Sequence, residues 1–508
     1  MPGMTPILLD HRGEPIRRNP LAPRRLDNRS TRYDAAQTGR DNQNHWAMAS
    51  GLSAAAANSP DVRRTLRNRS RYEVANNSYA CGMIRTLAND TIGTGPSLQM
   101  LSGDASADKQ IETSFWNWFQ AVRLADKLRC MRMARAVDGE VFARLFVNEN
   151  LRHQVQLDLK IYEAEQFARP WAVVDTDDQS DGITFDSAGE PLTYTVLREH
   201  PGDSGVLGGG AKYEIVPADL IIHQFRRERP GQLRGVPEIT PSLPLYAQLR
   251  RFTLATLDAA EHAADVAVLM RTQQNTTLAD DSIEPLDIFE LERGTIMTLP
   301  KGWEASQIAS KHPSTTYEMF KREIINEIAR CLNMPYNVAA GDSSRYNYAS
   351  GRMDHQVYFK SIAVDRSAYE ADLDRVFAKW WEIASLVTRV GDAEVLPPQM
   401  TELFSPPPHA WRWDGREHVD PSKEANAAVT LNDAGLQTDA EFYGKQGKDW
   451  EEQHLQKAKE LGVSVEEYRR LRREKLFGAP QRGQAQIEQA LERLSDLEER
   501  FEEVHRAG

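Results

Sequence analysis

Five acidic residues lie within a short stretch of the sequence, and carboxylates at such spacing are candidate ligands for divalent metal ions. They are Asp138, Glu140, Asp158, Glu163 and Glu165. A pair of metal ions held by such groups would cut DNA by stabilising both the attacking and the leaving oxygen. However, we identify no histidine that accompanies them, and acidic residues at strand ends are usually solvated. A metal-dependent nuclease is therefore the weaker hypothesis, and we expect no metal ion.

Other motifs that carry chemistry are incomplete or missing. The glycine-rich segment Pro201–Tyr213 lacks the Gly-Lys-Ser/Thr ending and the strand-to-helix context of a phosphate-binding loop, so we expect a hairpin tip. The chain has no Gly-x-Ser-x-Gly nucleophile motif. We therefore predict no catalytic residue, no enzyme activity and no cofactor, and any movement of a nucleic acid would need a separate motor.

The three cysteines are scattered at Cys81, Cys130 and Cys331, with no spacing typical of a metal site or a disulfide framework. We expect buried, reduced thiols.

One polar segment stands out between two helical patterns. The stretch Ala339–Arg352 reads AAGDSSRYNYASGR. It contains neither a metal-binding cluster nor a nucleophile with a base. Its polar candidates for binding are Asp342, Ser343, Ser344, Arg345, Tyr346, Asn347, Tyr348, Ser350 and Arg352.

Composition limits the class of protein. The chain has 508 residues, of which 40% are hydrophobic and 27% charged, as in ordinary folded proteins. No apolar run approaches the roughly 20 residues that span a bilayer, and the N-terminus lacks the order of a signal peptide. We therefore expect that the protein is made in a cytoplasm and does not associate with a membrane. The net charge of −12 argues against a protein that coats nucleic acid, although it allows local contact with DNA.

The N-terminal half contains an irregular arm, helices and then strands. Residues 1–45 are rich in arginine and proline, which fits either a solvated tail or an arm that touches a neighbour or nucleic acid. The stretch 59–93 is predicted as one helix, and 107–124 as a second. The first helix carries five arginines, which indicate a solvated face or, less favoured, a partner-binding face: Arg63, Arg64, Arg67, Arg69 and Arg71. Alternating patterns between 137 and 225 predict strands.

The second half reads as long helices around a small insert. A helix is predicted over 242–270, an insert over 271–312 that includes the strand-like stretch 294–300, and a helix opened by a Thr315–Glu318 capping box that stops before Pro335. A third helix is predicted over 350–386. The last helix has a short heptad seam, which fits either association around a symmetric assembly or packing on its own chain: Ile487, Ala490, Leu494, Leu497, Phe501 and Val504.

Several separate motifs resemble the lambda-type bacteriophage portal proteins, in the same order along the chain. The run starting at His223, HQFRRERPGQLRGVPEITPSLPLYAQLRR, is similar to that family's RPGQxRGvP turn and alanine-rich stem helix. The segment LNMPYNVAAGDSSRYNYASGR is similar to its NYSSxR-like signature, except that Ala349 replaces the first serine and Gly351 precedes the arginine. NNSYACGMIRTLANDTIGTGP, nearer the N-terminus, is also similar. The resemblance spans roughly residues 30–390.

The resemblance implies an α+β, mainly helical subunit of a ring, usually of twelve copies, at one vertex of a phage head. It implies the following regions: a flexible arm (1–45), a wing (46–241), a stem helix (242–270), a clip (271–312), a second stem helix (313–334), a tunnel loop (335–352), a tunnel or wing helix (353–396), a linker (397–414) and a helical crown (415–508). Double-stranded DNA would pass through the axis without sequence specificity during packaging and ejection.

The resemblance also implies partners and a role for the polar loop. The partners are other copies of the chain, the large subunit of the terminase motor, the major capsid protein and scaffold, and the head–tail adaptor, in a virion assembled in a bacterial cytoplasm. The arginines of the loop would touch phosphates briefly. Residues 313–390 hold ten basic and ten acidic residues, a balance that avoids tight binding. Alternatively, Tyr346 and Tyr348 pack on a neighbouring helix and only the loop tip meets DNA. A scaffold or another head-assembly protein remains the alternative function.

Overall fold

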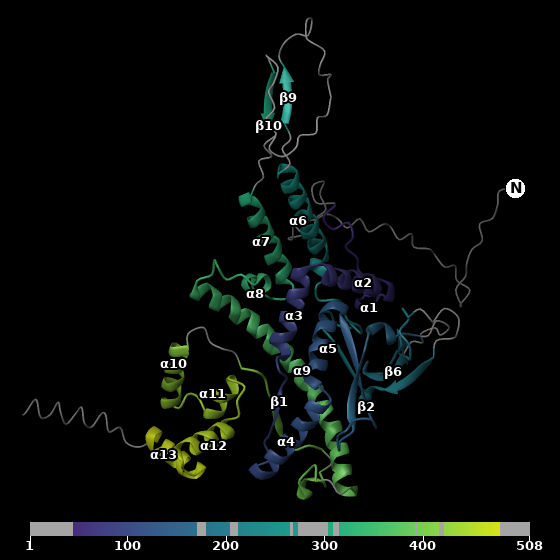
Figure 1. Cartoon of the computed structure of the whole chain (residues 1–508). Helices are drawn as coiled ribbons and strands as arrows, with labels where there is room; N and C mark the ends of the chain where they lie inside the picture. Colours follow the sequence, from purple (N-terminus) through teal and green to yellow (C-terminus); the bar gives the residue numbers. More distant parts are fainter. Residues whose placement is uncertain are drawn as a thin grey trace, which may run out of the picture. The chain divides into compact units, whose positions relative to one another are not determined.

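The computed structural model of the chain describes residues 44–169, 179–203, 212–264, 268–272, 303–307, 314–391, 394–403, 405–415 and 421–477. These residues form a mainly helical structure with small antiparallel sheets (Figure 1). The chain divides into two compact units, Met1–Ala57 and Asn58–Gly508. In the first unit the described part contains α1 (Ala54–Ala57), and most of the predicted arm lies outside the described residues.

The stretch predicted as one helix forms two. Helix α2 (Pro60–Asn76) ends at Asn77, which has an extended backbone and begins α3 (Ser78–Ile92). The Asn77 side chain accepts hydrogen bonds from the backbone N–H groups of Tyr79 and Ala80. Asparagine competes with the helical backbone for such bonds, so it interrupts the pattern and caps the second helix.

The first large hydrophobic core is aromatic. Helix α4 (Ala105–Ala121) buries Phe115, Trp118 and Phe119, and α5 (Leu124–Asp138) packs beside it. These side chains meet Phe377 and Trp380 from the long helix α9 (Tyr348–Val390), with the rings of Phe115 and Trp380 edge to face. This core therefore joins residues that lie more than 200 positions apart in the sequence.

The predicted strands form two antiparallel sheets. The first has the order β3-β2-β8, and the second β4-β5-β6-β7. Their bounds are β2 (Glu140–Val147), β3 (Leu157–Tyr162), β8 (Ile221–Phe225), β4 (Gln179–Ser180), β5 (Ile183–Phe185), β6 (Pro191–Leu197) and β7 (Tyr213–Pro217). Strand β2 is buried on both faces, since Val141 packs on the aromatic core and Phe142 on a separate core beneath β6. Short 3₁₀ turns occur at Ala164–Gln166, Ala218–Leu220, Thr240–Ser242 and Pro398–Met400.

The helix predicted over 242–270 is shorter than expected. Helix α6 is Leu243–Ala264, and Val268–Thr272 forms strand β9, paired antiparallel with β10 (Trp303–Gln307). The helical periodicity of the sequence continues into residues that instead find a strand partner. The strand-like stretch 294–300 lies outside the described residues.

Helix α7 is Ser314–Arg330. It begins before the predicted capping box, so Thr315 lies inside the helix and is not its cap. Helix α8 (Tyr336–Ala340) follows, and α9 extends over 43 residues, about 65 Å at 1.5 Å per residue. The N-terminal part of α9 contributes Tyr358 and Ile362 to a second core, which it shares with α3, α6 and α7.

The predicted linker over 397–414 is partly a strand. Residues His409–Arg412 form β11, which pairs antiparallel with β1 (Ser97–Met100). Trp411 packs against the aromatic core, so this part of the segment is held in place. Proline-rich composition correctly indicated an irregular chain, but it concealed the short pairing.

The C-terminal described residues are helical and charged, as expected. The helices are α10 (Pro421–Asp433), α11 (Asp439–Lys445), α12 (Trp450–Leu461) and α13 (Val465–Phe477). The predicted heptad seam lies outside the described residues. No helix in the described part of the chain combines the length and apolar character needed to cross a membrane. The prediction of buried thiols was wrong for Cys130, which is exposed, while Cys81 and Cys331 are half-buried.

Candidate functional site

The polar segment forms a tight turn between two helices. Within the predicted loop 335–352, α8 occupies the beginning and α9 the end, so the irregular part is only residues 341–347. Seven of the nine predicted site residues are exposed: Asp342, Ser343, Ser344, Arg345, Asn347, Ser350 and Arg352. Tyr346 is half-buried, and the backbone of Tyr348 opens α9. The structure therefore brings these residues together at the start of α9.

Local sequence explains the turn. Gly341 ends α8 with a left-handed φ of 67°, a conformation that costs little only for glycine. The Asp342 carboxylate accepts the backbone N–H of Ser344 at 2.9 Å, and hydrogen bonds from Ser344 lower the pKa of Asp342. The Asn347 side chain accepts the N–H of Ser350 at 2.9 Å and caps α9. Both ends of the turn are thus fixed by their own residues.

Tyr346 packs on α9, which agrees with the alternative that the tyrosine is structural. A Cβ added at Gly351 would lie 3.5 Å from Cδ1 of Tyr346, an ordinary van der Waals contact, so the ring lies beside Gly351 of α9. Partial burial, and then the nearby Asp354 carboxylate, raises the pKa of Tyr346. At the base of the turn, Asn337 Nδ2 lies 2.8 Å from His355 Nε2.

The two arginines of the segment differ in their partners. Arg345 forms an ion pair with Glu318 of α7 at 2.5 Å, and both side chains are more than half exposed. Arg352 is exposed on the second turn of α9, and within the described ranges it has no ion-pair partner. Both guanidinium groups are exposed and therefore available to an anion, that of Arg345 through exchange with Glu318.

The acidic cluster behind the nuclease hypothesis is neutralised by buried arginines. Glu140 is fully buried, and its carboxylate lies 2.8 Å from Arg234 and 3.2 Å from His223 Nε2. Burial alone would raise the pKa of Glu140, but Arg234 and His223 outweigh it and hold that pKa well below the usual range. Arg67 adds a third contact at 3.3 Å.

The other carboxylates are paired in the same way. Arg71 binds Asp138 at 2.7 Å and Glu165 at 2.9 Å, and it also contacts Glu163 at 3.1 Å. Asp158 pairs with Lys127. These cations occupy the positions that metal ions would need, so the geometry does not favour a two-metal site.

The five-arginine face predicted on the first helix was therefore wrong in part. Arg63 and Arg67 are buried and Arg71 is two-thirds buried, each with carboxylate partners, whereas Arg64 and Arg69 are exposed. Hydrophobic periodicity cannot reveal this, because the buried face of α2 is charged. The carboxylates that pair with these arginines lie within residues 138–181, and no local sequence pattern connects that stretch to α2.

The expectation that no histidine accompanies the acidic residues was also wrong. His200 Nε2 lies 3.2 Å from Glu163 and 3.8 Å from Glu165, which gives three groups with the donor types of a metal site. However, Arg71 already contacts both carboxylates, and His200 Nδ1 accepts the N–H of Gly202 at 3.0 Å. A neutral histidine that accepts at Nδ1 carries its proton on Nε2, so in this arrangement Nε2 offers no lone pair to a metal ion.

The motif that carried the family resemblance builds this network. Arg234 donates to Glu140 and to the carbonyl of Phe167, and Gly235 lies so close to Gly139 that an added Cβ would approach its carbonyl oxygen to 2.0 Å. Glu238 pairs with Arg132 and Arg135, which offset its burial and lower its pKa to about 2. The motif RPGQLRGVPE is therefore a junction between α2, α5 and β2.

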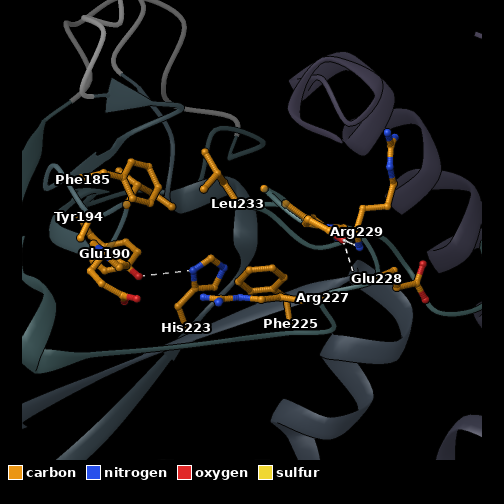
Figure 2. Close-up of a pocket in the computed structure, with 16 residues that line it drawn as sticks. Phe185, Glu190, Tyr194, His223, Phe225, Arg227, Glu228, Arg229 and Leu233 are labelled. Atoms are coloured by element: carbon orange, nitrogen blue, oxygen red, sulfur yellow. Dashed lines mark hydrogen bonds between the residues drawn. The ribbon is translucent and has the colours of Figure 1, made fainter. Parts of the chain in front are cut away.

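A cavity of about 570 Å³ opens between the β5–β6 hairpin and the segment 225–233 (Figure 2). Tyr194 and His223 lie on one side of it, with the tyrosine hydroxyl 3.4 Å from His223 Nδ1, and Arg227 lies over the ring of Phe225 at 5.5 Å. Its charged lining residues are Glu190, Arg227, Glu228 and Arg229. Two cations and two carboxylates balance, so the lining selects neither an anion nor a cation.

Comparison with known proteins gives consistent matches. The family described as "Phage portal protein, lambda family" matches residues 39–366. The chain is 24% identical to the "Probable portal protein" of Halomonas phage phiHAP-1, over 89% of this chain and 90% of that protein. It is 22% identical to "Portal protein B" of Escherichia phage lambda, over 64% of this chain and 66% of that protein. A chain from the neck of a native gene transfer agent particle is 12% identical and covers 78% of this chain and 95% of its own, with a TM-score of 0.42.

Proposed function

The chain belongs to the lambda family of phage portal proteins, and from that premise we propose that it forms a ring of twelve copies around a DNA channel at one vertex of a phage head. The family matches more than half of the chain, which carries the assignment. Its members are structural proteins of the head that serve DNA packaging. The resemblance noted in the sequence is therefore confirmed at the level of the family.

The regions of the portal follow from this proposal. Helices α6 and α7 form the stem, the segment between them forms the clip, and the strand-rich part with α2–α5 forms the wing. Antiparallel pairing of β9 with β10 supports a separate clip, because it closes the insert onto itself. Helices α10–α13 belong to the crown. The clip docks the terminase motor during packaging and the head–tail adaptor afterwards, while the wing meets the capsid protein and scaffold.

The turn 341–347 is the DNA-facing element. Its polar side chains are exposed, its ends are capped, and one arginine has no ion-pair partner in the described part of the chain. Contacts with phosphate need no base sequence, which suits a channel for any DNA. Since only two arginines per subunit take part and one is already paired, binding is weak enough for the duplex to slide.

The first experiment images the purified full chain by electron microscopy, with native mass spectrometry of the same sample. Closed rings with an axial hole wide enough for duplex DNA, near twelve subunits, are the expected result. A chain that stays monomeric or dimeric at high concentration, with and without scaffold protein, would contradict the ring. An assembly without an axial hole would favour the alternative function, a scaffold protein.

A metal-dependent nuclease has less support. Each carboxylate of the proposed site has a lysine or arginine partner, and Glu140 in particular faces Arg234 at 2.8 Å. Incubation of the rings with duplex DNA and Mg²⁺ or Mn²⁺ checks this directly, and cleavage that is lost in Glu163→Gln would revive the hypothesis.

A further inference from the structure

The turn between α8 and α9 is held at its base by contacts that DNA would not disturb. Gly341 and Asp342 fix the exit from α8, and Asn347 caps α9. The ring of Tyr346 lies against α9 beside Gly351. Within the exposed tip, Ser343–Arg345, the backbone N–H of Ser344 donates to Asp342, and the carbonyl of Ser343 accepts the N–H of Tyr346 at 3.1 Å. These local contacts define the backbone of the turn and leave the side chain of Arg345 to be held by other groups.

The tip has one ion pair, and it reaches a different helix. Arg345 contacts Glu318 on the second turn of α7, 27 positions earlier in the sequence. The side chains are 58% and 65% exposed. An exposed pair of this kind is weak, because water and salt screen it and two long side chains must be held still. It is strong enough to bias the tip toward α7 and weak enough to be broken by a competing anion.

The competitor that DNA offers has the same chemistry as Glu318. Carboxylate and phosphate both accept parallel N–H bonds from one planar guanidinium group. A phosphate that takes the place of Glu318 therefore leaves Arg345 paired, and the net change in free energy is the difference between two similar contacts. Arg352 differs, because it gains a contact without giving one up within the described residues.

We propose that Glu318 is a positioning residue that holds Arg345 against α7, and that a DNA phosphate displaces it, so that each turn has a docked and a released state. This inference rests on the proposed function of the turn as the DNA-facing element. In this role Glu318 lowers the affinity of the channel for DNA. Its carboxylate competes with each phosphate for Arg345 and so shortens the contact between Arg345 and DNA.

The test uses assembled rings of the full chain and a fluorescent duplex of random sequence, with dissociation followed over a series of salt concentrations. Glu318→Gln should strengthen DNA binding about two- to fivefold, the size of one exposed ion pair, and steepen the fall of affinity with salt. Glu318→Asp should restore most of the original behaviour. Glu327→Gln is the matched control, since it removes the same charge from an exposed position on α7.

The effect must depend on Arg345. In the double variant Glu318→Gln with Arg345→Ala, the gain from Glu318→Gln should vanish. Equal gains in Glu318→Gln and Glu327→Gln would overturn the proposal, because they would reflect only the net charge of the channel. A gain that survives Arg345→Ala would overturn it as well, since the carboxylate would then act through another group.

A second readout separates the docked state from the role of the turn in binding DNA. A spin label on Ser343→Cys, in a Cys130→Ser background because Cys130 is exposed, reports the motion of the tip without DNA. Glu318→Gln should mobilise the label, and unchanged motion would overturn the docked state. If the label is mobilised but no variant of Glu318, Arg345 or Arg352 alters DNA binding, the proposed function of the turn fails and displacement by phosphate fails with it.

Discussion

Arginine is used in two opposite ways in this chain. In the strand-rich region Arg234 is buried and contacts two carboxylates, Glu140 at 2.8 Å and Asp181 at 3.0 Å. In the turn before α9, Arg345 is exposed and contacts one carboxylate, and Arg352, near the start of α9, is exposed as well. The first arrangement excludes any other anion, whereas the second invites one.

Burial and the number of partners account for the difference. A buried guanidinium group must have its charge compensated, because an unpaired charge in the interior costs several kcal/mol. The buried network therefore tolerates no exchange of partners and fixes the geometry of the strand-rich region. An exposed ion pair contributes about 0–1 kcal/mol, so its partners can separate at little cost. A portal needs both properties, a rigid frame and a surface that releases DNA as readily as it binds it.

The largest effect is expected from removing the centre of the buried network. Glu140→Gln keeps the shape of the side chain but leaves Arg234 and Arg67 without their shared charge, which should lower the free energy of unfolding by about 3–5 kcal/mol. Urea denaturation of the unassembled chain, followed by tryptophan fluorescence, measures it. Glu149→Gln, at an exposed position beyond β2, should change stability by less than about 0.5 kcal/mol. Similar losses of unfolding free energy in both variants would show that the buried ion pairs contribute no more to stability than an exposed charge does.

The second prediction concerns the backbone approach that lets Arg234 reach Glu140. An alanine at Gly235 would place its Cβ 2.0 Å from the carbonyl oxygen of Gly139, so the segment must shift away from β2. We expect Gly235→Ala to cost about 1–3 kcal/mol, as overpacking usually does. Gly82→Ala is the control, because its Cβ meets nothing within 4 Å and alanine favours the helix by about 0.5–1 kcal/mol. A stable Gly235→Ala variant would mean that this contact is not needed for the network.

The third prediction tests a carboxylate that lacks an arginine. Glu112 accepts the N–H of Met100 at 2.8 Å, and burial, aided by the charge of Asp449, raises the pKa of Glu112 to about 7 from a usual 4.5. Its folded form therefore binds the proton more tightly, so its contribution to stability is complete below about pH 4.5 and is lost as the pH rises through 7. Glu112 is only half-buried, so solvent screening reduces the loss to about 1 kcal/mol.

The measurement is the free energy of unfolding at pH 5 and pH 8 for the native chain and for Glu112→Gln. The glutamine variant should be more stable relative to the native chain at pH 8 than at pH 5. If the difference is the same at both values, Glu112 does not titrate between them. This result would weaken the contrast with Glu140, whose arginine partners move the pKa in the opposite direction.

The sequence was sufficient for much of the fold and for the family. The strands between 137 and 225 were predicted from alternation, although β2 turns out to be buried on both faces. The long helix α9 was predicted over 350–386 and spans Tyr348–Val390, and the C-terminal part was predicted to be helical and charged. In each of these elements local pattern and final structure agree.

The errors arose where contacts between distant residues decide the structure. The split at Asn77 and the strand β9 override a continuing helical pattern, and β11 depends on pairing with β1, more than 300 positions away. The buried face of α2 was not predicted, because its arginines are buried through ion pairs with carboxylates that lie outside α2. For the turn, the sequence indicated which residues are polar and exposed, but not that Arg345 contacts Glu318, since that pair joins two helices through side chains alone.

The smallest effect on stability, and the clearest on function, is expected in the turn. Arg345→Ala with Arg352→Ala should leave the free energy of unfolding within about 0.5 kcal/mol and ring formation intact, because both side chains are exposed. DNA retention in filled particles and the rate of packaging should change. Arg352→Ala alone should weaken binding of duplex DNA more than Arg345→Ala alone, since Arg345 must first leave Glu318 and so contributes less net binding. The reverse order would show that Glu318 does not restrain Arg345, and loss of the ring would show that these arginines contact a neighbouring subunit. In the second case the exposed arginines would be structural, as the buried arginines are.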